Sequence, residues 1–178
     1  VDFDAQAMSN SLYGLQSMSS EHNEVCSLIT ALANKVAESK PILKAQAIGS
    51  ALYGLQNLDS DALEVRTLLA ALVEKVELAT ESLDAQAIGN ALFGLQRMKS
   101  NSPEVRALVA AIGQKIQDFE VPMDSQGIGT ALYGLHSMGT DQAQVRTLLK
   151  ILAERIDKSD CNLNGQAISD SLYGLHAM

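Results

Sequence analysis

The chain of 178 residues has no tryptophan, three prolines and two cysteines. Its aromatic residues are four tyrosines and three phenylalanines. This scarcity of prolines and β-forming aromatic residues, beside abundant Ala, Leu, Gln, Glu and Lys, favours helices over strands. Cys26 and Cys161 have no short spacing between them, so neither a disulfide framework nor a metal site is expected. The small number of cysteines is compatible with a reducing compartment.

The sequence also lacks long apolar runs and an excess of basic residues. No run of about eighteen apolar residues occurs, so membrane insertion is not expected. Thirteen Lys and Arg residues oppose twenty-one Asp and Glu residues, which gives a formal net charge of −8. This balance disfavours non-specific binding to nucleic acid or membrane surfaces, although a local neutral or basic groove stays open. Because 47% of the residues are hydrophobic, we expect an ordered core.

A forty-residue repeat organises the whole chain. The motif SLYGLQ starts at Ser11, and its relatives ALYGLQ, ALFGLQ, ALYGLH and SLYGLH start at Ala51, Ala91, Ala131 and Ser171. Neither end resembles the polar unit that usually caps a repeat array, so we expect the chain to be an excerpt of a longer one. The spacing divides the single array 1–178 into four complete units and a partial one, namely 1–40, 41–80, 81–120, 121–160 and 161–178.

Each unit contains two stretches with helical periodicity, here called helix A and helix B. In the third unit the apolar stripe of helix A consists of Ile88, Ala91, Leu92, Leu95 and Met98, and that of helix B consists of Val105, Leu108, Val109, Ile112 and Ile116. One hairpin cannot bury both stripes alone, whereas stacked hairpins can. The sequence therefore predicts an all-α fold, an α-solenoid of stacked antiparallel helical hairpins with a 40-residue period.

The ends of both helices are marked. Helix A follows an expected N-cap residue at Asp4, Asp84, Asp124 and Asn164, with Lys44 as the exception. Helix B follows Ser20, Ser60, Ser100 or Thr140 and has a cation near its end at Lys35, Lys75, Lys115 and Arg155. Its first turn carries a glutamate in the first three units, at Glu24, Glu64 and Glu104. The helix A glycines at Gly14, Gly54, Gly94, Gly134 and Gly174 predict a close approach of neighbouring helices, with each aromatic ring in the groove beside the next glycine.

A column of arginines has two readings. Arg66, Arg106 and Arg146 recur forty residues apart and could meet phosphates along a strand. We prefer a structural role, in which each arginine pairs with the helix B glutamate one unit earlier, namely Glu24, Glu64 or Glu104.

Two polar columns on helix A are the candidate ligand-binding residues. One is glutamine in every unit, and its neighbour varies among small hydrogen-bonding residues, with almost no Lys or Glu in either. A third column beside them consists of Ser17, Asn57, Arg97, Ser137 and Ala177, in which we single out Arg97. One variable hydrogen-bond donor or acceptor per unit is what a protein that recognises successive RNA bases requires. Helix positions that merely face solvent would also vary in this way. The two main columns are Gln6, Gln46, Gln86, Gln126 and Gln166, and Asn10, Ser50, Asn90, Thr130 and Asp170.

The stretch SQGIGTALYGL at 125–135 resembles the second helix of the octotricopeptide repeat, whose pattern runs Pro-Gln-Asp-Leu-Ala-Asn-Thr-Leu-Trp-Ala-Leu. Gln126, Ile128 and Thr130 correspond in type and spacing, and SPEVRALVAAIGQKI at 102–116 looks like that family's other helix. The resemblance covers essentially the whole chain, with Tyr or Phe in place of Trp and forty residues in place of thirty-eight. It implies a helical-hairpin solenoid that binds single-stranded RNA inside the cell, in a chloroplast or mitochondrion.

Catalysis is not expected from this sequence. No nucleophile–base pair, glycine-rich phosphate loop or set of paired carboxylates stands out, so we expect neither catalytic residues nor a cofactor. His136 and His176 occupy one column without a third ligand and are expected to be polar surface residues rather than metal ligands. Two non-catalytic functions remain: modular binding of single-stranded RNA, and a scaffold that binds a protein partner or forms part of a large assembly.

Overall fold

The structure is a computed structural model that describes residues 3–118, 122–176 and 178. Within these residues all regular secondary structure is helical, comprising nine α-helices and one short 3₁₀ helix. The predicted all-α class is therefore confirmed.

Five helices correspond to helix A of the sequence units. The first four have nine residues each and end at the aromatic residue before a glycine, whereas the fifth has twelve. In four of them the backbone N–H three residues after the cap donates to the cap side chain at 2.7 or 2.8 Å, which confirms Asp4, Asp84, Asp124 and Asn164 as N-caps. These A helices are α1 (Ala5–Tyr13, followed by the 3₁₀ helix Gly14–Ser17), α3 (Ala45–Tyr53), α5 (Ala85–Phe93), α7 (Ser125–Tyr133) and α9 (Gly165–His176).

The A helix without its own cap, α3, receives one from the next unit. Lys44 has no acceptor to offer, and the N–H of Ala45 instead donates to Oε2 of Glu81 at 3.4 Å. Nζ of Lys44 lies 4.0 Å from Oε1 of the same carboxylate. A carboxylate therefore stands at the start of each of the first four A helices, where the helix dipole favours negative charge.

Four longer helices correspond to helix B. Three of them have sixteen residues and the last has fifteen. Pro103 is the first residue of α6. Proline is favoured at this position because the first N–H of a helix has no partner within the helix and the fixed φ angle is already helical. These B helices are α2 (Asn23–Glu38), α4 (Leu63–Leu78), α6 (Pro103–Asp118) and α8 (Ala143–Asp157).

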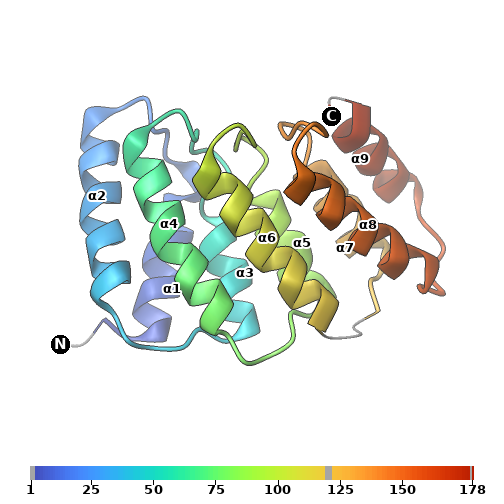
Figure 1. Cartoon of the computed structure of the whole chain (residues 1–178), viewed down its shortest axis with the longest axis horizontal. Helices are drawn as coiled ribbons and strands as arrows, with labels where there is room; N and C mark the ends of the chain where they lie inside the picture. Colours follow the sequence, from blue (N-terminus) through green and yellow to red (C-terminus); the bar gives the residue numbers. More distant parts are fainter. Residues whose placement is uncertain (1–2, 119–121, 177) are drawn as a thin grey trace.

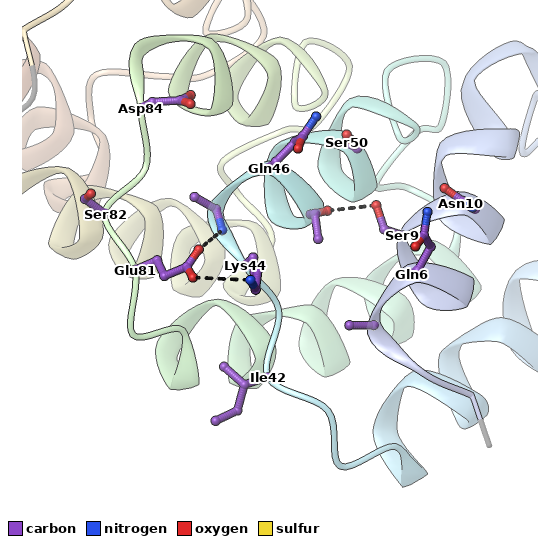
Figure 2. Close-up of a pocket in the computed structure, with 13 residues that line it drawn as sticks. Gln6, Ser9, Asn10, Ile42, Lys44, Gln46, Ser50, Glu81, Ser82 and Asp84 are labelled. Carbon is purple, nitrogen blue, oxygen red and sulfur yellow. Dashed lines mark hydrogen bonds and ion pairs between the residues drawn. The ribbon is translucent and has the colours of Figure 1, made fainter.

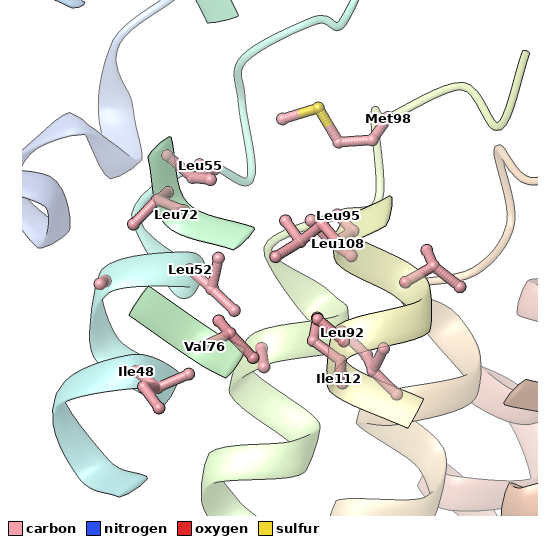
Figure 3. Packing of buried hydrophobic residues seen from close by; sticks show 14 of the residues in the cluster. Ile48, Leu52, Leu55, Leu72, Val76, Leu92, Leu95, Met98, Leu108 and Ile112 are labelled. Carbon is pink, nitrogen blue, oxygen red and sulfur yellow. The ribbon is translucent and has the colours of Figure 1, made fainter. Parts of the chain in front are cut away.

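The helices form two rows, one of A helices and one of B helices (Figure 1). The main contacts of each helix are with the helix forty residues away: α1 with α3, α3 with α5, α5 with α7 and α7 with α9 in one row, and α2 with α4, α4 with α6 and α6 with α8 in the other. The interior lies between the rows, where Leu52 of α3 and Leu55, just after α3, point toward Leu72 and Val76 of α4 (Figure 3). All ten residues predicted for the two stripes of the third unit are buried.

Glycines allow the A helices to approach one another closely. A Cβ atom added at Gly94 would overlap the carbonyl oxygen of Leu52, and one at Gly134 would overlap that of Leu92. The predicted close approach is thus confirmed, but the prediction for the rings is wrong. Gly54, Gly94, Gly134 and Gly174 lie against the backbone of the preceding A helix, and the aromatic rings stack on one another instead.

The cations near the ends of the B helices hold the B row together. Nζ of Lys115 donates to the carbonyls of Glu77 and Ala79 at 2.8 and 2.6 Å, and Lys75 and Arg155 make equivalent contacts with the unit before them. Each cation therefore neutralises the carbonyl end of the preceding B helix rather than its own. The first unit has no predecessor in this chain, and its Lys35 pairs with Glu38 at 3.6 Å.

The loops between helices A and B are joined in a similar way. The hydroxyl oxygens of Ser20, Ser60 and Ser100 accept the backbone N–H of a residue thirty-nine positions later, at 2.9 to 3.0 Å. Nζ of Lys99 also contacts the carboxylates of Asp59, at 3.7 Å, and Asp61. Each of the first three units is therefore tied to the next one at this loop.

The preferred account of the arginine column is wrong. Arg66, Arg106 and Arg146 form no ion pair with the glutamates one unit earlier within the described residues, and each donates from Nη1 to two carbonyls of its own loop at 2.7 to 3.0 Å. The carboxylate near Arg66 belongs to the following unit and is that of Glu104. A hydrogen bond from Ser102 and then its own backbone N–H lower the pKa of Glu104, and the positive charges of Arg66 and Arg106 lower it further.

Candidate functional site

The two predicted columns form one exposed stripe along the A row, here called the polar stripe. The five glutamines are exposed, and their neighbours at Asn10, Ser50, Asn90, Thr130 and Asp170 are exposed or half-buried. Members four residues apart share one side of a helix, as Nε2 of Gln166 shows by donating to Oδ1 of Asp170 at 2.8 Å. In the described part of the chain the side chains of the other eight make no hydrogen bond, so a ligand can reach their donors and acceptors.

The stripe borders a groove of about 890 Å³ at the starts of α1 and α3 (Figure 2). Gln6 and Asn10 reach it from α1, and Gln46 and Ser50 reach it from α3. Beneath them the hydroxyl of Ser9 donates to the carbonyl of Ala47 at 3.2 Å, which fixes the spacing of the two helices. The linker before α5 closes the far side with Glu81, Ser82 and Asp84.

Two smaller hollows continue the stripe toward the C-terminus. One of about 270 Å³ lies between α5 and α7, lined by Gln86 and Asn90 on one side and Gln126 and Thr130 on the other. The other, of about 370 Å³, shares Asn90, Gln126 and Thr130 with aromatic rings from three units. The structure thus brings together predicted residues of neighbouring units, although the two residues of the last unit, Gln166 and Asp170, mainly contact each other.

A ladder of aromatic rings, which the sequence reasoning missed, runs beside the polar stripe. Consecutive ring centroids lie 5.0 to 5.8 Å apart and consecutive planes are inclined by 15 to 22°. Rings this close fill the space between one another and present their edges to the surface. The signal was available in the sequence, because an aromatic residue follows each variable polar residue by three positions. The aromatic ladder consists of Tyr13, Tyr53, Phe93, Tyr133 and Tyr173.

Two side chains of the third polar column form hydrogen bonds with the preceding unit. Nδ2 of Asn57 donates to the carbonyl of Gln16 at 2.7 Å, and the hydroxyl of Ser137 donates to that of Gln96 at 2.6 Å. These contacts tie the end of one A helix to the unit before it, so the two side chains are not directed to a ligand. Arg97 is exposed at the same position of the third unit, and Ala177 lies outside the described residues.

The charges around the polar stripe are few and mostly negative. Lys44 lines the large groove together with Glu81 and Asp84, and Arg97 is exposed in the third column. The carboxylates of Asp84 and Asp124 already accept N–H groups of their own helices. Helix starts that elsewhere bind phosphate are therefore occupied by the chain itself.

The donors, acceptors and ring edges of the site suit hydrogen bonds and ring contacts with a ligand. Within the residues that the structure describes, no cluster of three His, Cys, Asp or Glu side chains could hold a metal ion. The ring of His136 lies beside the aromatic ladder and is edge-on to the rings of Tyr133 and Tyr173, with centroids 5.4 Å apart in both pairs. None of the helices in the described part of the chain is long and apolar enough to cross a membrane.

Comparison with known proteins gives no match: no protein-family model, no curated protein and no solved structure is similar to this chain.

Proposed function

We propose that the chain is a non-catalytic α-solenoid of stacked helical hairpins with a 40-residue period, and that its polar stripe binds single-stranded RNA. Both proposals agree with the resemblance to octotricopeptide repeats. The two rows of helices, with their neighbours forty residues away, support the architecture. The geometry of the polar stripe supports the ligand.

The observation that carries the proposal is a pair of side chains that recurs on the exposed side of helix A. In each of the first four units it combines a constant glutamine with one small polar residue, and neither side chain has a hydrogen-bonding partner in the described chain. Unstacked bases present donors and acceptors on their edges, and such bases are the usual target of sequence-specific RNA recognition. One variable side chain per unit would then select one base per unit.

The aromatic ladder limits how the bases are held. Because each ring already stacks on its neighbours, with centroids no more than 5.8 Å apart, a base cannot enter between two rings without separating two A helices. Bases would contact ring edges while their own edges meet the polar stripe. Hydrogen bonds, rather than intercalation between protein rings, would provide most of the specificity.

Few positive charges are available to neutralise phosphates. If Lys44 of the large groove and the exposed Arg97 were the residues that neutralise phosphates, binding would release about one to two counterions, and the affinity would fall only weakly as salt is raised. A steep salt dependence would instead point to another, more basic surface.

The test is a titration of the purified chain with a random pool of single-stranded RNA, followed by enrichment of the bound sequences. Substitution of Asn90 by Ala removes one side chain of the stripe and should weaken binding of the enriched RNA by about 2- to 10-fold, the usual effect of one or two hydrogen bonds. Its matched control is Asn34→Ala, at an exposed position of α2 in the B row, which should leave the affinity unchanged. Absence of binding even at low salt would contradict the proposal.

A second candidate, binding of an extended polypeptide, is favoured by the carboxylates at the starts of the first four A helices. These groups repel phosphate but not a neutral peptide backbone. A glutamine side chain offers one donor and one acceptor group, which match the N–H and C=O of a peptide unit. If a random peptide library is enriched and the RNA pool is not, and Asn90→Ala weakens the peptide complex, the polar stripe binds protein.

A further inference from the structure

The hollow between α5 and α7 lies where the A row lacks one methyl group. A Cβ atom added at Gly49 of α3 would lie 2.9 Å from Cα of Ala87, which faces it in α5, and the same contact recurs at 2.8 Å between α7 and α9. A Cβ atom added at Gly89 of α5 would lie 3.6 Å from Cα of Gly127, which replaces the facing alanine. The two backbones are therefore further apart at this point, which leaves the hollow of about 270 Å³.

A carboxylate with one uncommitted oxygen lines this hollow. Asp124 caps α7, and its Oδ1 accepts the N–H of Gly127 at 2.7 Å. The other oxygen, Oδ2, has no hydrogen-bond partner among the residues that the structure describes. Because a carboxylate oxygen only accepts hydrogen bonds, a ligand group that pairs with Oδ2 must be a donor.

The other polar side chains of the hollow adapt to either kind of ligand. Gln86, Asn90 and Gln126 each carry an amide with donors and an acceptor, and the hydroxyl of Thr130 can act as both. These four side chains make no hydrogen bond within the described chain. Among the described side chains that line the hollow, Asp124 is thus the one that can only accept.

The four RNA bases differ in what they present to such an acceptor. Adenine, cytosine and guanine have an exocyclic amino group, which donates, whereas uracil has two carbonyl oxygens, which accept. A uracil carbonyl that faces Oδ2 would be repelled, and both oxygens would lose water without gaining a donor. Polar groups left unpaired in this way weaken a complex.

We propose that the hollow between α5 and α7 is a subsite that selects a base with an exocyclic amino group and rejects uracil, with Oδ2 of Asp124 as the acceptor of that group. The inference rests on the proposed binding of single-stranded RNA to the polar stripe and adds the class of base at one position. The large groove at the starts of α1 and α3 has Lys44 beside its carboxylates, so it does not impose the same selection.

Asp124→Asn tests the carboxylate without removing the helix cap. Asn164 shows that asparagine caps an A helix in this chain, because its Oδ1 accepts the N–H of Ala167 at 2.8 Å. In Asp124→Asn the amide nitrogen takes the place of Oδ2, so a donor replaces an acceptor. The variant should keep its circular dichroism spectrum, while the preference of the hollow should pass from an amino group to a carbonyl oxygen.

The probe is a random pool of single-stranded RNA, enriched separately on the unmodified chain and on Asp124→Asn. RNA enriched on the unmodified chain should lack uracil at one position. Placing uracil there should weaken binding by about 5- to 150-fold, the discrimination that one good side-chain contact with a base provides. On Asp124→Asn the RNA with uracil should bind at least as tightly as the RNA without it.

The matched control is Asp4→Asn, which removes the same charge from the cap of α1, outside this hollow. It should keep the selection against uracil. The subsite is overturned, and the proposed function stands, if RNA binds but uracil is accepted at every position, or if Asp124→Asn still rejects it. If no RNA binds even at low salt, the proposed function and the subsite are both overturned.

Discussion

Lys75 is a buried cation that has a carbonyl oxygen as its partner. The residue is only 3% exposed, and its Nζ donates to the carbonyl of Ser39 at 2.5 Å, at the end of the preceding B helix. A charged donor compensates that carbonyl more fully than a neutral one, and hydrogen bonds to charged groups contribute about 1.5–3 kcal/mol. A single side chain thus links two units through the end of a helix.

We predict that Lys75→Met lowers the free energy of unfolding by about 1–3 kcal/mol, because the carbonyl of Ser39 is left without its donor while the apolar stem is kept. Urea titration followed by circular dichroism measures the change. Lys35→Met is the matched control, since Lys35 holds the same position in the first unit but is exposed and paired only with Glu38. Its effect should stay within about 0.5 kcal/mol, and equal losses for the two variants would refute the role given to Lys75.

Glu104 links stability to pH. Its pKa is lowered in the folded chain, first by the hydroxyl of Ser102 at 2.7 Å and then by its own backbone N–H and nearby arginines. A lowered pKa contributes stability that is fully present above the unfolded value, about 4.3 for glutamate, and that is lost as the pH falls through the folded value. Glu104 is thus expected to make the chain less stable in acid.

We predict that Ser102→Ala raises the pKa of Glu104 toward its ordinary value, and that Glu104→Gln reduces the loss of stability on the acid side. Carboxyl-carbon NMR measures the first effect and urea midpoints at several acidic pH values measure the second. Ser102→Thr keeps a hydroxyl group and should preserve the low pKa. A pKa that does not move in Ser102→Ala would exclude the hydrogen bond as its main cause.

The A helices are elements whose spacing depends on glycine. Gly94 lies so close to the carbonyl of Leu52 that no Cβ atom fits, whereas a Cβ at Gly14 in the first unit would have nothing within 4 Å. The same residue type therefore has opposite effects at equivalent positions. At Gly94 it permits contact between α3 and α5, and at Gly14 it only lowers helix propensity.

Gly94→Ala should accordingly destabilise the chain by about 1–3 kcal/mol or more, as overpacking does in well-packed interiors. Gly14→Ala should stabilise it by about 0.5–1 kcal/mol. Thermal and urea unfolding of the two variants give the comparison. If both substitutions shifted stability in the same direction, close packing of the A helices at Gly94 would be disproved.

Features within one helix could be predicted from the sequence, and features between units mostly could not. The caps at Asp84 and Asp124 and the apolar stripes depend on local spacing, so they were predicted correctly. The partners of Arg66 and Lys75 depend on the offset between stacked helices, which no spacing within one unit encodes. The arginine prediction failed for that reason: it placed the glutamate in the preceding unit, and the stack places it in the following one.

For the whole molecule, repetition makes one interface between units much like the next. Each A helix contacts the A helix forty residues away, and the cation and serine contacts recur at thirty-six to thirty-nine residues. The stability of such an array is approximately the sum of its units and their shared interfaces. The columns of the candidate site could be predicted from the sequence because they repeat every forty residues. Its hollows could not, because they form where neighbouring A helices meet.

Deleting residues 41–80 should therefore leave a shorter folded chain. We expect the same helical content per residue and a cooperative unfolding transition at lower urea concentration, because one unit and one interface are lost. Deleting residues 51–80 removes fewer residues but breaks the forty-residue register, and it should cost more stability. Circular dichroism and urea titration decide between the two outcomes, and a larger loss for the forty-residue deletion would contradict the expectation.

The aromatic ladder also gives the molecule an optical probe of its own. All four tyrosines of the sequence belong to it, and tryptophan, which would mask their emission, is missing. Ring-to-ring coupling at these distances should produce a strong near-ultraviolet dichroic band and rapid transfer of excitation between neighbouring tyrosines. Any ligand that spreads the A row would weaken both signals, so the spacing of the units can be followed in solution without a label.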